Sequence, residues 1–202
     1  MDNKKIRERT EEEIDLRKKV LLELLELLNK KKIFSFIWGG VLLGFIRDKN
    51  FIKWDWDVEI GFYSKDLKKN WSIILKLMEE NNFTVDYFNF EELKINVSKY
   101  TSKETTTFSL MGWRYDLFTG NYIRNKLNVP KKYFEKMEKI KLFGAEFFCP
   151  SPVTEYLSYI YGNWKVPLKT VNKNEYLSSK NLRKNNWFLY CKIDKFLFNL
   201  FN

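Results

Sequence analysis

The sequence contains no histidine, and this absence excludes several kinds of active site. A Ser-His-Asp or Cys-His nucleophile system cannot be built, and neither can a zinc site with histidine ligands. Acid–base chemistry near neutral pH must therefore use Asp, Glu, Lys, Tyr or a metal-bound water. Only two cysteines are present, Cys149 and Cys191, without a CxxC motif. They predict reduced thiols in a cytoplasmic protein and no disulfide framework.

The sequence also lacks an apolar run long enough to cross a bilayer. The longest run, residues 34–46, falls short of the roughly 20 residues that a spanning helix needs, and the charged N-terminus has no signal-peptide core. With 45% hydrophobic residues, the 202-residue chain can bury the core of one domain. We expect a cytoplasmic protein, either soluble or peripheral at the inner face of the membrane.

Positive charge is in excess, with 36 Lys and Arg residues against 26 Asp and Glu residues and a net charge of +10. Residues 163–202 carry eight positive and only two negative side chains. This balance favours an anionic partner, such as a nucleic acid, an acidic lipid surface or a phosphorylated ligand. Residues 187–202 have a helical, mostly apolar pattern with lysines. Such a helix fits either an anionic membrane interface or packing on the domain or on a second subunit.

Hydrophobic periodicity and breaker residues predict the secondary structure. A capping box at Thr10–Glu13 opens a helix to about residue 28, and a strand at 34–38 ends at the pair Gly39-Gly40, from which a short helix starts. The further elements are a strand at 57–62, a helix at 64–81, strands at about 84–90, 93–99, 105–110 and 113–118, a hairpin of 140–143 with 146–148, a helix from the cap Ser151 and Pro152 to Tyr161, a loop at 169–185 and a helix from Trp187.

This order predicts an α/β (α+β) fold, with a mixed β-sheet flanked by helices. We expect the catalytic domain at residues 1–168 and a basic, aromatic C-terminal extension at 169–202.

Three acidic residues alternate along the predicted strand that begins at residue 57. Side chains two apart in a strand share a face, so Asp55, Asp57 and Glu59 are expected to project together. Three carboxylates repel one another unless a cation lies among them, and a hard divalent ion, Mg²⁺ or alternatively Mn²⁺, prefers oxygen ligands. The alternative is a solvated polar face of an edge strand without a metal.

The glycine pair decides between these alternatives. Gly39 and Gly40 join a strand to the N-terminus of a helix, where backbone N–H groups bind phosphate. A phosphate-binding turn about 15 residues before paired carboxylates is what metal-assisted phosphoryl transfer requires. The spacing therefore predicts an active site.

Asp116 is a lone acid in an otherwise hydrophobic predicted strand. Burial of an acid is costly unless it is paired or bound to a metal. We predict that Asp116 joins the metal site as a third carboxylate and accepts the proton of an attacking hydroxyl. The alternative is a buried ion pair with Arg114 or with a lysine.

Four segments read together point to a family. Residues 39–47 read GGVLLGFIR and residues 51–61 read FIKWDWDVEIG, while 115–118 read YDLF and 161–164 read YGNW. In this order they resemble the LicD family, which includes bacterial phosphocholine transferases and the animal fukutin and fukutin-related proteins. The resemblance covers roughly residues 15–168.

The resemblance implies a nucleotidyltransferase-like fold and a reaction. A phospho-alcohol would pass from a CDP-activated donor, such as CDP-choline or CDP-ribitol, to a glycan or lipid-linked glycan hydroxyl, with release of CMP. It also implies the site residues: Asp57, Glu59 and Asp116 as catalytic metal ligands, with Asp55 beside them, and Gly39, Gly40, Arg47, Tyr161, Gly162 and Trp164 in substrate binding. Arg47 would contact donor phosphate, although a surface arginine is the alternative. Tyr161 and Trp164 are alternatively core aromatics.

Four residues depart from the family pattern. Trp56 stands where bacterial members commonly have an acid, Glu59 where Asp is usual, Lys53 where Pro is usual and Asp48 where His is frequent. None of these changes removes a core carboxylate, so they affect the identity of the donor more than the activity.

Two other function classes fit part of the pattern. A nucleotidyltransferase that moves NMP from an NTP would use the same carboxylates and would release pyrophosphate instead of CMP. A basic, non-enzymatic module for nucleic acid or membranes fits the net charge, but clustered acids would repel phosphate without a metal. We therefore expect no nucleic-acid partner.

Overall fold

The fold is built on a mixed β-sheet. The computed structural model describes residues 6–170, 172–178, 182 and 184–201. The main sheet has the strand order β1 (Phe36–Ile37), β2 (Asp57–Tyr63), β5 (Thr105–Asp116), β4 (Lys94–Tyr100) and β3 (Thr84–Asn89). β2 and β5 are parallel and the other pairs are antiparallel. At the far end of β5, the sheet continues through β6 (Asn121–Arg124) and β7 (Leu127–Pro130).

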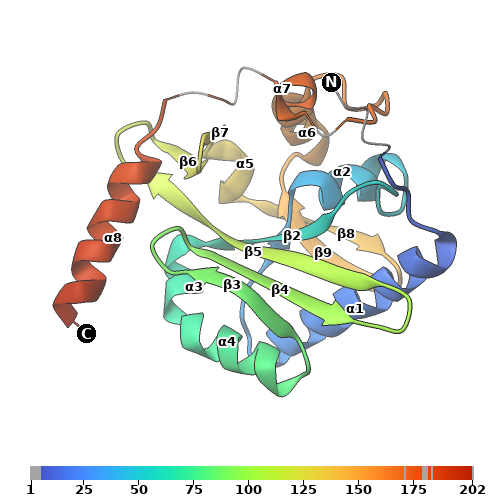
Figure 1. Cartoon of the computed structure of the whole chain (residues 1–202). Coiled ribbons are helices and arrows are strands. Elements are labelled where there is room, and N and C mark those ends of the chain that lie inside the picture. The colour runs from blue at the N-terminus through green and yellow to red at the C-terminus, as the bar shows by residue number, and fades with distance from the viewer. Residues whose placement is uncertain (1–5, 171, 179–181, 183, 202) are drawn as a thin grey trace.

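Helices flank this sheet, as predicted. Figure 1 shows one group of helices along one side of the sheet and a second group above β2. The first group is α1 (Glu11–Lys30), α3 (Ser64–Lys69) and α4 (Trp71–Glu80), and the second is α2 (Gly39–Arg47), α6 (Val153–Tyr161) and α7 (Lys173–Tyr176). The remaining elements are α5 (Lys132–Glu135), the hairpin of β8 (Met137–Leu142) and β9 (Ala145–Pro150), and α8 (Trp187–Phe201).

The local sequence explains the elements around the site. The Thr10 side chain accepts from the Glu13 N–H and the Glu13 side chain accepts from the Thr10 N–H, so the predicted capping box starts α1. In β2, Val58 and Ile60 are fully buried, whereas Asp57 and Glu59 are half-buried on the opposite face. This alternation directs the acids away from the core and towards α2.

The strand β5 is continuous, and the prediction of two strands at 105–110 and 113–118 was wrong. Gly112 does not interrupt it, because the Gly112 N–H donates to the carbonyl of Leu93 over 2.9 Å, and the Leu93 side chain would lie 2.8 Å from a Cβ at this position. Gly112 is therefore present because the packing against Leu93 leaves no room for a side chain, and it does not mark a turn.

Three other expectations need correction. The helix predicted at 64–81 is divided at Asn70, whose side-chain amide donates to the carbonyl of Asp66 over 2.8 Å. Pro152, and not Ser151, is the N-cap of α6. The helix ends at Tyr161, as predicted, and the following residue, Gly162, has a φ of 64°. The predicted loop 169–185 contains α7, and its residues 171, 179–181 and 183 lie outside the described part of the chain.

Within the described ranges, no helix combines the length and the apolar character that crossing a bilayer requires.

Candidate active site

The acidic residues of β2 lie directly against the first turn of α2. Oε2 of Glu59 accepts a hydrogen bond from the backbone N–H of Gly40 over 2.7 Å. A Cβ atom on Gly39 would lie 1.6 Å from Oε2 of Glu59, and one on Gly40 would lie 2.0 Å from Oδ2 of Asp55. Gly39 also has a φ of +64°, which an L side chain rarely adopts. The glycine pair therefore permits the contact between the carboxylates and the helix.

The N-terminus of α2 binds an anion in this arrangement. The positive end of a helix dipole and its free N–H groups favour negative charge, and here the Glu59 carboxylate supplies it. The expected binding of phosphate at the same turn stays a prediction, and a phosphate there would compete with Glu59 for the Gly40 N–H.

Asp57 is held by the neighbouring strand. Its Oδ2 atom lies 2.5 Å from Oγ of Ser109 on β5, and the same hydroxyl lies 3.3 Å from Oδ1 of Asn96 on β4. The parallel register aligns Glu59 with Ser109 and Asp57 with Thr107. A polar row therefore crosses three strands beside the carboxylates.

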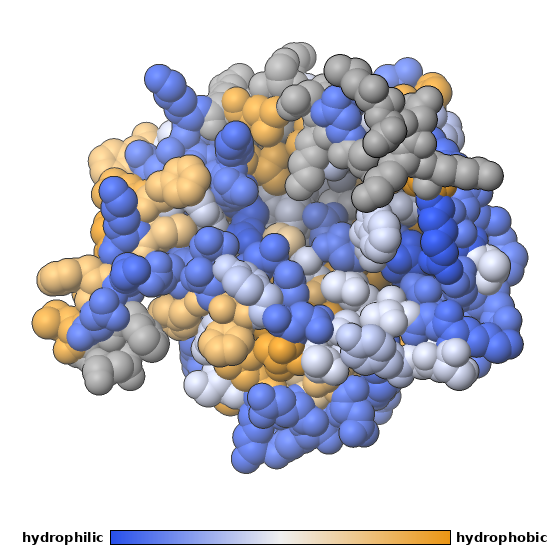
Figure 2. Space-filling view, viewed as in Figure 1, coloured by the Kyte–Doolittle hydropathy of each residue, from blue (hydrophilic) through white to orange (hydrophobic). Residues whose placement is uncertain are grey.

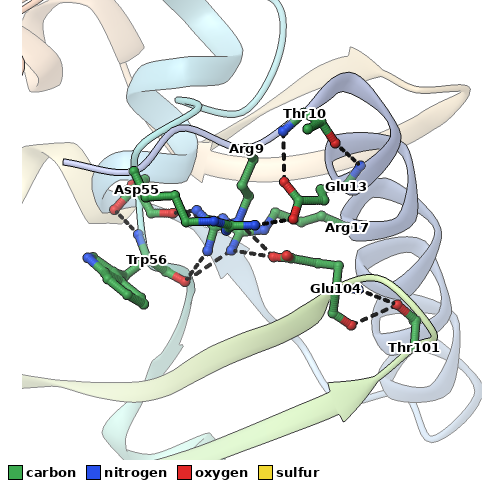
Figure 3. Close-up of polar contacts among 9 residues, drawn as sticks. Arg9, Thr10, Glu13, Arg17, Asp55, Trp56, Thr101 and Glu104 are labelled. Carbon is green, nitrogen blue, oxygen red and sulfur yellow. Dashed lines mark hydrogen bonds and ion pairs between the residues drawn. The ribbon is translucent and has the colours of Figure 1, made fainter. Parts of the chain in front are cut away.

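Two buried arginines fix the turn that precedes β2 (Figure 3). Arg17 donates to the carbonyl of Asp55 over 3.1 Å and to that of Trp56 over 3.0 Å, and Arg9 donates to both carbonyls as well. Glu104 pairs with Arg9 over 2.7 Å and with Arg17 over 3.4 Å. Because each carbonyl accepts from a planar guanidinium, the backbone between Asp55 and Asp57 is held in one geometry.

Electrostatics link these groups. Burial, followed by the charge of Asp57, raises the pKa of Asp55 to about 6, against the opposing effect of Arg17. Burial, followed by the like charge of Arg9, lowers the pKa of Arg17 to about 10. The negative charge of Asp57 thus adds to burial in disfavouring the ionised form of Asp55, and a cation between the two carboxylates would remove this repulsion.

The donor set fits a hard divalent ion in its chemistry. Asp55, Asp57 and Glu59 offer only oxygen atoms, which suit Mg²⁺ and Mn²⁺ better than softer metals. Among the residues that the structure describes, no three acidic, cysteine or histidine side chains are close enough together to hold an ion. The four-residue set of Asp55, Asp57, Glu59 and Asp116 is therefore not assembled as one metal cluster.

Asp116 lies away from the other acids. β5 aligns Ser109 with Glu59, and Asp116 is seven residues further along β5, which corresponds to about 23 Å at 3.3 Å per residue. Its carboxylate is fully buried and accepts from the Phe118 N–H and the Thr119 hydroxyl, each over 3.0 Å. It also accepts from Asn186 over 3.2 Å. The predicted third carboxylate is therefore a structural residue that orders the turn after β5.

The alternative of an Asp116 ion pair with Arg114 is also wrong. Arg114 pairs instead with Asp194 of α8 over 2.7 Å, and its guanidinium lies 4.2 Å from the ring of Trp187.

Arg47 is not directed at the carboxylates either. It lies at the C-terminal end of α2, opposite the glycine pair, and makes two hydrogen bonds of 2.7 Å to the Asp48 carboxylate. Its side chain is only 9% exposed, so the alternative of a surface arginine is also wrong. The bidentate pair occupies the fork that would otherwise bind phosphate.

The YGNW segment is divided between two roles. Burial, followed by the charge of Glu59, raises the pKa of Tyr161 well above its usual range, which places this phenol near the carboxylates. Trp164 follows α6, is buried and donates to Oγ of Ser158 on that helix over 3.0 Å, so it packs against α6 as a core aromatic. Gly162 ends α6, and a Cβ there would meet no atom within 4 Å.

A comparison with known families decides the identity of the domain. The family model described as LicD/FKTN/FKRP, nucleotidyltransferase domain, matches residues 32–152. The chain belongs to this family. The match includes the glycine pair and the acids of β2, whereas the YGNW segment lies outside it.

Two individual proteins are similar to this chain. An uncharacterized Rickettsia prowazekii (strain Madrid E) protein, RP689, is 28% identical over 144 residues, which are 69% of this chain and 51% of that protein. The chain therefore spans about half the length of this relative. The solved structure of the antibiotic-resistance factor ANT(2'')-Ia has a TM-score of 0.50 at 11% identity, with 92% of both chains covered. This likeness confirms the nucleotidyltransferase fold of the LicD-family domain.

Two tyrosines near the LicD-family carboxylates were not predicted. Burial, followed by the charges of Glu59, Asp55 and Asp57, raises the pKa of Tyr176 on α7 to about 12. Its ring centroid lies 6.2 Å from that of Tyr161. The hydroxyl of Tyr156 is buried without a hydrogen-bond partner among the described residues, and Glu59 contributes to the raised pKa of this phenol. A buried polar atom of this kind beside an acid is a further feature that a bound ligand would satisfy.

The sequence does contain a signal for one missed residue. Arg17 lies in the stripe Ile14, Leu21, Leu24 and Leu28, whose other members are all fully buried. An arginine on the inward face of a helix requires a buried partner, and that partner is the turn before β2. Tyr176 has no comparable signal, because it lies in a Lys/Asn-rich segment.

Proposed function

We propose that this domain transfers a phospho-alcohol group, such as phosphocholine or ribitol phosphate, from a CDP-activated donor to a glycan hydroxyl. A bond forms between the acceptor oxygen and the donor phosphorus, the phosphoanhydride bond to CMP breaks, and the hydroxyl proton is released. The observation that carries the proposal is the direct contact of the Glu59 and Asp55 carboxylates with the glycine turn of α2. Family membership supports it.

Each group of the site has a part in this reaction. Asp57, Glu59 and Asp55 supply the oxygen ligands that Mg²⁺ prefers, and they would hold the ion only after moving closer together than they lie in this structure. The bound ion would neutralise the phosphate charge. We place the diphosphate at the N-terminal turn of α2, at Gly39 and Gly40, where it would displace Glu59 from the Gly40 N–H. Burial, followed by the charge of Glu59, raises the pKa of Tyr161 and of Tyr176, and we propose that both phenols line the donor side of the site. Gly162 ends α6, and Trp164 donates to Ser158 of that helix.

We leave two residues out of the proposed chemistry. Asp116 is too far along β5 to share a ligand with Asp57, and Arg47 is already paired with Asp48.

The test is a panel of donors with the purified protein. CDP-choline, CDP-ribitol, CDP-glycerol, CDP-ethanolamine and NTPs are incubated with Mg²⁺ and followed by thermal shift and phosphorus NMR. We expect one CDP-alcohol to raise Tm and to release CMP in the presence of a glycan acceptor, with loss of both signals in EDTA. Release of pyrophosphate from an NTP would instead identify the alternative, a nucleotidyltransferase that moves NMP. No turnover of any donor would reject both.

The C-terminal extension, residues 169–202, contains a second surface. In α8, the hydrophobic side chains Phe188, Phe196 and Leu200 are each more than 60% exposed, and Leu117 and Phe118, in the turn whose backbone bonds to Tyr190, are 78% and 76% exposed. Figure 2 shows hydrophobic and hydrophilic side chains alternating over α8 at the edge of the molecule.

Charge favours an anionic lipid surface as the occupant of this face. The extension carries the exposed Lys192 and Lys195 among its apolar residues, and the whole chain has a net charge of +10. An amphipathic helix with lysines binds the interface of anionic membranes by burying its apolar face and through the attraction of its lysines to the anionic lipids. We therefore place the reaction in the cytoplasm at the inner face of a membrane, where a lipid-linked glycan would be the acceptor.

A further inference from the structure

An exposed tryptophan lies between two of the site carboxylates. Trp56 is 71% exposed, and it follows Asp55 and precedes Asp57 in the turn before β2. Its indole points away from the two arginines that hold its backbone (Figure 3).

The backbone under this indole is unusually constrained. Arg17 and Arg9 both donate to the Trp56 carbonyl, over 3.0 and 3.3 Å. Both guanidinium groups are buried and both pair with Glu104. A ring on a fixed backbone loses little conformational freedom when a ligand stacks on it, so this arrangement is preorganised for binding.

Trp56 lines a shallow depression of about 420 Å³ next to the acids. The depression is open to solvent, so it would hold one end of a longer ligand and would not enclose a small molecule. Thr107, the register partner of Asp57, lies on its wall and connects the depression to the carboxylates. The other lining residues include Thr101, Thr105, Arg7 and Lys103.

The charges around the depression are nearly balanced, because three carboxylates face four cations, with Glu104 shared by Arg9 and Arg17. Arg7 pairs with Glu13, Lys103 pairs with Glu12 and Arg9 pairs with Glu104. Since each of these cations already has a carboxylate partner, the depression offers little net positive charge for a phosphate. Its threonine hydroxyls and its aromatic ring suit a neutral polar ligand with one apolar face.

A sugar ring has this chemistry, with hydroxyls at its edge and C–H groups on its faces. We propose that the depression binds the acceptor end of a neutral glycan, with a sugar ring stacked on Trp56 and a hydroxyl directed at the Asp57 side of the site. This inference rests on the proposed function and names its acceptor class. Trp56 is then a residue that positions the acceptor, separate from the donor-binding turn at Gly39 and Gly40.

The experiment is saturation-transfer difference NMR on the full chain with three neutral probes, maltotriose, cellotriose and triacetylchitotriose. We expect at least one probe to receive saturation, and Trp56→Ala to weaken its binding by about tenfold or more, as for an aromatic anchor. Trp56→Phe should recover most of the signal. Phe88→Ala removes an aromatic side chain that is 58% exposed on β3 and serves as the matched control, with unchanged binding expected.

Competition distinguishes a sugar from a nucleobase. We expect CMP to leave the saccharide signal of the wild-type protein unchanged. Displacement of the signal by CMP, equal signals in the wild type and Trp56→Ala, or no saccharide signal in the wild type would each overturn the inference. The protein could bind a saccharide through Trp56 and still turn over no CDP-alcohol. This result would support the sugar site and reject the proposed transferase reaction, so failure of the sugar site and failure of the proposed function are distinguishable.

Discussion

Oε2 of Glu59 lies 2.7 Å from the backbone nitrogen of Gly40, and this hydrogen bond joins β2 to the first turn of α2. The proposed metal-binding acids and the proposed phosphate-binding turn are therefore in contact, although 19 positions separate these two residues in the chain. Any side chain on the glycine pair would displace the acids.

The first prediction concerns Gly39→Ala. The new methyl group would collide with the Glu59 carboxylate, so we expect donor turnover to fall by at least about tenfold, or about 1.4 kcal/mol of activation free energy. The matched control is Gly144→Ala. Gly144 also has a positive φ, +76°, but a Cβ there meets no atom within 4 Å. Both variants should lose roughly 1–2 kcal/mol of stability from backbone strain, and only Gly39→Ala should lose activity. Equal activity losses would contradict the contact.

The second prediction tests the carboxylates themselves. Asp57→Asn and Glu59→Gln keep the size of each side chain and remove its negative charge, so we expect turnover to fall by roughly two orders of magnitude or more with the fold intact. Circular dichroism and Tm check the fold, and CMP release measures turnover. Near-wild-type rates in both variants would reject the proposed mechanism.

A third prediction separates Asp116 from that site. Asp116→Asn replaces a carboxylate that accepts from several donors, so we expect a loss of about 1–3 kcal/mol in the free energy of unfolding. Turnover per folded molecule should stay at the wild-type rate, because Asp116 lies at the opposite end of β5. Chemical denaturation and CMP release measure the two quantities. Loss of turnover at unchanged stability would return Asp116 to the catalytic set.

The fourth prediction concerns Arg17, a positioning residue. Arg17→Met keeps the bulk of the side chain but leaves the carbonyls of Asp55 and Trp56 with fewer donors, so we expect a loss of about 3 kcal/mol in stability, as for a broken buried ion pair. The turn before β2 should shift, which would lower kcat and raise the Mg²⁺ concentration needed for half-maximal rate.

Lys30→Ala is the control on the same helix, because the Lys30–Glu26 pair is exposed and its loss should leave Tm and kcat unchanged. If Arg17→Met changes stability but leaves the Mg²⁺ dependence of the rate unchanged, Arg17 is structural only.

The fifth prediction addresses α8. We expect the protein to float with vesicles that contain phosphatidylglycerol and not with pure phosphatidylcholine vesicles. Phe196→Ser with Leu200→Ser should abolish flotation, because both side chains are more than 60% exposed on the apolar face. Phe88→Ser, at a comparably exposed position on β3, should float normally. Unaltered flotation of the double variant, or a dimer in solution that buries α8, would contradict membrane binding.

Local sequence patterns determined much of the fold. The capping box at Thr10 and the alternation of buried and polar residues from Asp57 specify α1 and β2 without reference to the rest of the chain. These two elements were predictable since they depend on residues close together in the chain. The contact of the acids with the glycine turn was not predicted: the sequence indicated that this turn binds phosphate, whereas Glu59, 19 positions after Gly40, accepts from the Gly40 N–H.

Tertiary structure alone decided the positions of Asp116, Arg47 and Tyr176. A lone acid in a hydrophobic strand gives the same sequence pattern whether it binds a metal or orders a turn. Only the register of β5 with β2 shows that Asp116 lies far from Glu59. The ring centroid of Tyr176 lies 6.2 Å from that of Tyr161. Burial, followed by the charges of Glu59, Asp55 and Asp57, raises the pKa of Tyr176, and no local pattern encodes this placement. The sequence by itself thus determined that acids alternate along β2 and that a glycine pair starts α2. The pairing of distant strands determined which other groups join them, because the distance between two strands in space does not follow from their separation in the chain.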